Sequence, residues 1–79
     1  MKYWAFFYHI DPVAGGYLEG IGDRSVIRLD GRMSIRRMRK IAAQACKERK
    51  YDGYSIERGT SLLHTFAMTT VQPVKQKGD

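Results

Sequence analysis

The sequence is poor in the residues that cross-link or metallate small domains: its 79 residues include one cysteine and two histidines. Cys46 therefore cannot form an intrachain disulfide, and His9 and His64 do not supply a ligand cluster at metal-binding spacing. We expect no metal ion and no other cofactor. A lone cysteine is typical of a reducing compartment, so a cytoplasmic location is expected.

Long apolar runs are also missing. No run approaches the roughly 18 to 20 residues of a membrane-spanning helix. The N-terminal run KYWAFFYHI is rich in aromatics, is followed by Asp11 and lacks the small-residue cleavage site of a signal peptide. This run is typical of a β-strand, and we expect a soluble protein with no membrane partner.

Recognisable catalytic sets are absent as well. Nucleophilic catalysis needs a nucleophile, a base and a group that orients the base. Cys46 lies on an apolar helical stripe, and His9 and His64 lie in predicted strands, where half-buried histidines are ordinary. The glycines of GGYLEGIG match no phosphate-binding loop. The sequence therefore predicts no catalytic residues and a protein that is not an enzyme.

Length and composition indicate one small globular domain. A chain of 79 residues is too short for two domains, and its 43% apolar content is too high for a chain that stays unfolded. We expect one domain over residues 1–72 and a flexible tail over residues 73–79, where QPVKQKGD has little to bury. A core this small stabilises weakly, so a homodimer that buries more surface is a further expectation.

Extended segments are predicted on both sides of one helix. Residues 2–10 carry β-forming side chains on both faces of a pleat, and residues 17–29 resume in extended style after the turn DPVAGG. Gly20 and Gly22 interrupt that second segment, which is either one bent strand or two short ones. After the helix, YSIER, a turn at GTS and LLHTFAMTTV predict a second hairpin.

The helix is predicted to follow Ser34, whose hydroxyl can cap the first turn. Apolar residues recur at spacings of three and four from Ile35 to Cys46 and form one stripe, and Gly53 is expected to end the helix in a left-handed conformation. The order predicts a two-layer α+β fold: an antiparallel sheet of about four strands in ββαββ order, with one amphipathic helix on one face. The other sheet face is then solvated or covered by a partner.

Positive charge is concentrated around the predicted helix. Residues 32–50 contain eight Lys or Arg and one acid, and the rest of the chain contains six Lys or Arg and seven acids, so the two parts carry +7 and −1. At 100° per residue, Arg36, Lys40 and Lys47 fall within about 40° of one another, opposite the apolar stripe. Arg37 and Arg39 lie in the same turns.

Two interpretations account for this basic surface. One is a solvated face, which is where charged side chains ordinarily lie. The other is an anion-binding surface, and it predicts a small accessory or regulatory domain that binds nucleic acid with little sequence preference. The predicted phosphate-binding residues are Arg36, Arg37, Arg39, Lys40 and Lys47.

The aromatic N-terminal strand offers a second candidate surface. Its pleat divides the side chains into two sets, Tyr3, Phe7 and His9 on one side and Trp4, Phe6 and Tyr8 on the other. If the second set faces the helix, the first forms an exposed face that can stack on bases or contact a protein; the reverse arrangement is equally open. The alternative function is therefore a protein-interaction module, an inhibitor or adaptor that uses the uncovered sheet face or a strand edge.

Overall fold

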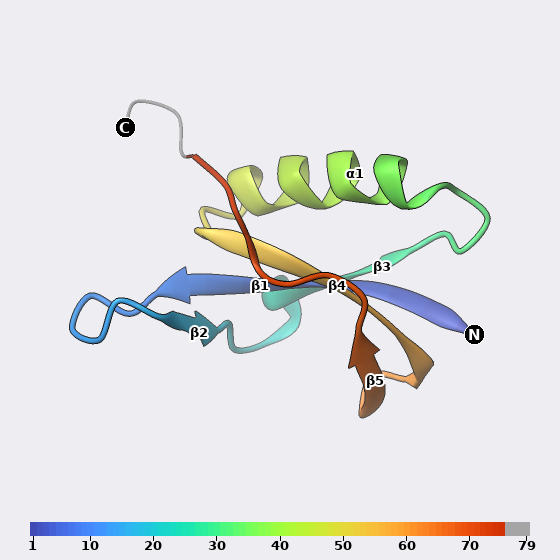
Figure 1. The fold of residues 1–79 in the computed structure, drawn as a ribbon, viewed down its shortest axis with the longest axis horizontal. Helices are drawn as coiled ribbons and strands as arrows, with labels where there is room; N and C mark the ends of the chain where they lie inside the picture. The colour runs from blue at the N-terminus through green and yellow to red at the C-terminus, as the bar shows by residue number, and fades with distance from the viewer. Residues whose placement is uncertain (76–79) are drawn as a thin grey trace.

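The computed structural model describes residues 1–75 and shows one helix packed on a curled antiparallel sheet of six strands (Figure 1). This arrangement confirms the predicted α+β class. The elements in chain order are β1 (Lys2–Ile10), β2 (Tyr17–Glu19), a short 3-10 turn (Asp23–Ser25), β3 (Val26–Leu29), α1 (Ile35–Glu48), β4 (Gly53–Ser61), β5 (His64–Ala67) and β6 (Gln72–Pro73).

Two long strands, β1 and β4, form the centre of the sheet and pair antiparallel from Lys2 opposite Gly59 to Tyr8 opposite Gly53. Each long strand has two short strands on its other edge. β3 and β2 pair with successive halves of β1, and β6 and β5 pair with successive halves of β4. The predicted count of about four strands was therefore too low, and the chain order is βββαβββ.

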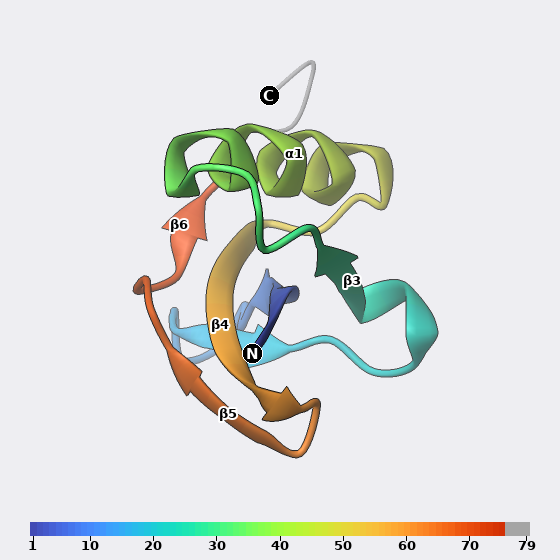
Figure 2. The ribbon, with the colours of Figure 1, turned by 90° about the vertical axis from the view of Figure 1, so that its right-hand side faces the viewer.

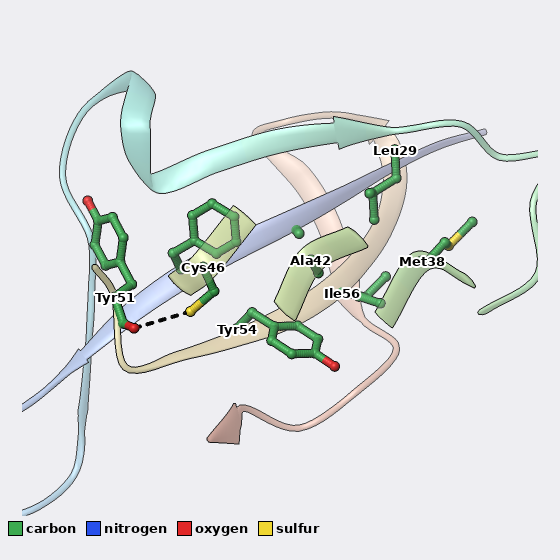
Figure 3. Close-up of a cluster of buried hydrophobic side chains, with 9 residues drawn as sticks. Leu29, Met38, Ala42, Cys46, Tyr51, Tyr54 and Ile56 are labelled. Atoms are coloured by element: carbon green, nitrogen blue, oxygen red, sulfur yellow. Dashed lines mark hydrogen bonds between the residues drawn. The ribbon is translucent and has the colours of Figure 1, made fainter. Parts of the chain in front are cut away.

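The helix covers the sheet face to which Ala5 and Phe7 of β1 point. These residues lie opposite Ile56 and Tyr54 of β4, and all four are buried. Residues one helical turn apart on α1 complete this core, which Figure 3 shows in close-up; they are Met38, Ala42 and Cys46. Burial at every fourth position is the pattern expected of a helix that lies flat on a sheet.

The opposite sheet face is partly covered by the curl of the sheet itself. β4 bends strongly and carries β5 beneath the sheet (Figure 2). Trp4 points to this face and is only 6% exposed, although it is outside the core under α1. Side chains from the turn after β4, Leu62 and Leu63, line a shallow depression together with Trp4. We expected this face to be either solvated or covered by a partner. That expectation needs correction, because the curled sheet covers part of the face itself.

The helix begins as predicted, since the Arg37 N–H donates to Ser34 Oγ at 3.2 Å. Its end differs from the prediction. The left-handed residue is Lys50, with φ of 62°, and the Tyr51 N–H donates to Cys46 O at 3.0 Å. Gly53 instead belongs to β4, where a Cβ would lie 2.9 Å from the Gln72 carbonyl oxygen, so glycine allows β6 to approach.

The second hairpin also differs from the prediction, and the start of the predicted tail makes contacts with the fold. The turn lies at residues 62 and 63, after Ser61 pairs with His64, and not at GTS. Residues 73 and 74 are held by the fold, because Pro73 pairs with Gly53 and the Val74 N–H donates to Asp52 O at 2.8 Å. The flexible tail over residues 73–79 stays a prediction, and residues 76–79 lie outside the described part.

Candidate nucleic-acid interface

The outer face of α1 carries the predicted cations. Because Met38, Ala42 and Cys46 point into the core, side chains about 180° away on the helix point outward. Four of them form what we call the basic ridge, and all are exposed: Arg36, Arg37, Lys40 and Lys47. The ridge runs along about three turns of the helix. Figure 1 shows α1 over one face of the sheet, so the outer side of the helix is the side away from the sheet.

Within the described residues, no ridge cation forms an ion pair with a carboxylate. Among residues 1–75, Arg32 forms an ion pair with Asp30 at 3.5 Å and the His9 ring lies 3.7 Å from the Asp52 carboxylate, and neither contact includes a cation of α1. The first turn of α1 contains no acid. The single acid of the helix, Glu48, accepts a hydrogen bond from the neutral Gln44 amide at 3.0 Å. Positive charge on this face is therefore open to an external anion.

Arg39 does not belong to the ridge. At 100° per residue it lies on a flank of α1, between the buried stripe and the outer face. Its charge acts on Tyr54: burial raises the pKa of this phenol, and the nearby Arg39 opposes that rise. The structure thus separates Arg39 from the other four predicted phosphate-binding residues, although its side chain is exposed.

The predicted stacking face of Tyr3, Phe7 and His9 is not assembled. Phe7 is fully buried under α1, and the Arg49 guanidinium lies 5.7 Å from its ring centre. Tyr3 packs against the same core, and exposed His9 stacks on the Tyr51 ring at 4.3 Å. These odd-numbered residues of β1 face the helix, so Phe7 is not available to a partner.

The reverse set of aromatics is not an open platform either. Trp4 is buried, and Phe6 and Tyr8 are half-buried. Tyr8 Oη lies 2.9 Å from Ser55 Oγ, which in turn is 3.4 Å from Glu57 Oε2. Burial raises the pKa of Tyr8, and the hydrogen bond with Ser55 acts in the opposite direction. These contacts link β1 to β4 and account for the polar groups of Tyr8, Ser55 and Glu57 without a ligand.

Sequence reasoning missed a second cationic group. Lys2 of β1, Arg28 of β3 and Arg32 of the following turn line one depression at the end of the sheet, together with Asp30. The Arg32 N–H donates to Asp30 Oδ1 at 2.9 Å, and this hydrogen bond lowers the pKa of that carboxyl. The residues are up to 30 positions apart, so only knowledge of the β1–β3 pairing could have grouped them.

Cys46 is a buried thiol of the core under α1. It is fully buried, and its thiol donates to Tyr51 O at 3.4 Å (Figure 3). Burial raises the pKa of Cys46 to about 11, and the negative charge of Asp52 acts in the same direction. The thiolate is the nucleophilic form of cysteine, and burial disfavours it here. The presence of Cys46 is therefore explained by its packing in the core.

Over residues 1–75, no three His, Cys, Asp or Glu side chains lie close enough together to hold a metal ion. No helix in the same range has the length and apolar character needed to cross a bilayer.

Comparisons with known protein families, with curated proteins and with solved structures found no match to this chain. Function is therefore inferred from the charge and geometry of the surfaces described above.

Proposed function

We propose that this protein is a small accessory or regulatory domain without enzymatic activity, which binds nucleic-acid phosphates through the basic ridge. The observation that carries the proposal is the grouping of Arg36, Arg37, Lys40 and Lys47 on one outward helix face. No ion pair among the described residues neutralises them.

The type of side chain on the ridge favours phosphate contacts over base recognition. Lys and Arg neutralise phosphates and release condensed counterions, which gives affinity without sequence preference. The helix contains no aromatic residue that could stack on a base. Four phosphate contacts would give a slope of about −3.6 in log affinity against log salt on a duplex, at about −0.9 per contact.

The position of two of the arginines adds support. Arg36 and Arg37 lie in the first turn of α1, where positive charge opposes the helix dipole by about 0.3–1 kcal/mol per residue. Acidic residues would stabilise the helix there, and the helix has none in that turn. Lys47 carries less weight, because a cation in the last turn is favourable for the helix itself.

The test is a fluorescence-anisotropy titration of labelled single-stranded and duplex DNA and RNA at two salt concentrations. The Arg36→Gln/Lys40→Gln variant is compared with a matched control, Arg24→Gln/Lys75→Gln, which removes two exposed cations outside the ridge. We expect the ridge variant alone to lose most of the affinity and to show a smaller salt dependence. Absence of binding at low salt, or equal losses in the two folded variants, would contradict the proposal.

A second candidate function is a protein contact through the β4–β5 hairpin, either with a partner protein or with a second copy of the chain. This hairpin ends at the sheet edge and exposes a group of apolar side chains, Leu62, Leu63, Phe66 and Met68. An unpaired edge with exposed apolar residues is a common protein-binding surface.

Sedimentation analysis over a range of protein concentrations tests self-association through this hairpin. Leu63→Ser and Val13→Ser form a matched pair, since the two side chains are 91% and 95% exposed and lie in different hairpins. If the wild-type protein self-associates, and Leu63→Ser abolishes this whereas Val13→Ser does not, the result would support the hairpin contact. A wild-type protein that stays monomeric would argue against a dimer.

A further inference from the structure

The cations at the end of the sheet lie on a different side of the molecule from the basic ridge. We call Lys2, Arg28 and Arg32 the end group. Arg28 pairs with Trp4, and Lys2 lies two residues before Trp4 on the same face of β1, so both side chains project from the sheet face opposite α1. The ridge, in contrast, projects from the outer side of α1.

Arg32 connects these two faces. It lies in the turn between β3 and α1, where the N-terminus, the end of β3 and the start of the helix meet at one end of the molecule (Figure 1). Arg28, Arg32 and Arg36 follow one another at four-residue spacing, so successive Cα atoms can be at most about 14 Å apart. From the ridge, around the end of the molecule, to the far sheet face, cations therefore recur at Cα separations of at most about 14 Å.

Carboxylates of the protein compete only weakly with a phosphate for the cations of the end group. Asp30 is its acidic neighbour, and the ion pair with Arg32 joins side chains that are 56% and 93% exposed. Exposed pairs of this kind stabilise little, so a phosphate can replace the carboxylate as the partner of Arg32. Lys2 and Arg28 form no ion pair with any described residue.

The shape of this series selects among nucleic acids. The molecule measures 35 × 23 × 21 Å, whereas duplex DNA is stiff over about 500 Å. A duplex that lies on the ridge passes straight across such a small protein and does not reach the end group, because bending it around the end would be costly. A single strand has a flexible backbone and can follow the cations from one face to the other.

We infer that the preferred partner is a single-stranded nucleic acid whose phosphates pass from the basic ridge over Arg32 to Arg28 and Lys2. This inference rests on the proposed function of the ridge and adds the class of partner and a second set of contacts. A strand of about 12 nucleotides lies within the usual range of site sizes for one small domain.

The test compares a single strand of about 12 nucleotides with the duplex of the same sequence, as DNA and as RNA, by anisotropy at several salt concentrations. Arg28→Gln is matched with Arg24→Gln, which removes an equally charged exposed residue at the 3-10 turn. We expect Arg28→Gln to weaken single-strand binding several-fold and to reduce its salt slope by about 0.7. Duplex affinity should not change, and Arg24→Gln should change neither.

The outcomes separate the two proposals. If Arg28→Gln behaves like Arg24→Gln, or weakens duplex and single-strand binding equally, the single-strand path is wrong, while loss of binding in the Arg36→Gln/Lys40→Gln variant still supports the ridge. If no nucleic acid binds at low salt, both proposals fail. Lys2→Gln is a second variant at the other side of the depression, and circular dichroism checks that each variant is folded.

Discussion

The inner and outer faces of α1 differ in how firmly the fold holds their side chains. On the inner face Met38 and Cys46 are buried, and Arg49, just after the helix, donates to Arg24 O at 3.1 Å and lies over the Phe7 ring. On the outer face Lys40 and the other ridge cations form no ion pair and no cation–π contact among residues 1–75. Cations on the helix and at its end thus fall into two classes: Arg49 contacts the rest of the fold, whereas the ridge cations are left to solvent or to a partner.

Among variants of the two faces, the largest expected change in the free energy of unfolding is at Met38. Met38→Ala removes a side chain that is 3% exposed and should lower the free energy of unfolding by about 2–5 kcal/mol, through lost burial and a cavity. Lys40→Ala, half a turn away on the outer face, should change it by no more than about 0.5 kcal/mol. Urea denaturation followed by circular dichroism measures both. Similar losses in the two variants would mean that the outer face also stabilises the fold.

A smaller effect is expected at Arg49. Arg49→Gln removes the guanidinium contacts with Arg24 O, with Val26 O and with the Phe7 ring, and should cost about 1–2 kcal/mol. Lys47→Gln, which removes a ridge cation two residues earlier, serves as the control and should cost less than about 1 kcal/mol. Urea denaturation followed by circular dichroism measures the unfolding free energy of both variants. An Arg49 variant as stable as wild type would show that these contacts contribute nothing.

The smallest of these stability effects concerns the backbone at the end of α1. Lys50 is the one described non-glycine residue with positive φ, a conformation that costs an ordinary residue about 1 kcal/mol. Lys50→Gly should therefore raise the unfolding free energy by up to about 1 kcal/mol. The matched change Lys47→Gly lies inside the helix and should lower it by about 1 kcal/mol. Equal signs for the two glycine variants would contradict this assignment of the helix end.

Local features of the fold could be predicted from the sequence. The cap at Ser34 and the buried stripe through Met38, Ala42 and Cys46 depend on residues within a few positions of one another. The outward direction of Arg36 and Lys40 follows from the same periodicity. For this reason the ridge was identified before the structure was known.

Features that depend on long-range pairing could not be predicted in this way. Alternation along β1 gives two sets of side chains but does not say which faces the helix, so Phe7 was open to either assignment until the position of α1 was known. Gly59 suggested a turn, yet it lies within β4 at an irregular pairing, where a Cβ would collide with the His64 backbone. Lys2 and Arg28 meet only because β1 pairs with β3.

The central claim, that the cations at the start of α1 serve binding and not folding, is tested most directly by measuring two quantities on one variant, Arg36→Gln/Arg37→Gln. We expect its affinity for nucleic acid to fall and its salt slope to shrink by about one per lost phosphate contact. Its free energy of unfolding should stay the same or rise by about 0.3–1 kcal/mol per residue, because the unfavourable interaction with the helix dipole is removed. A variant that binds as tightly as wild type, or that unfolds more easily, would contradict the claim.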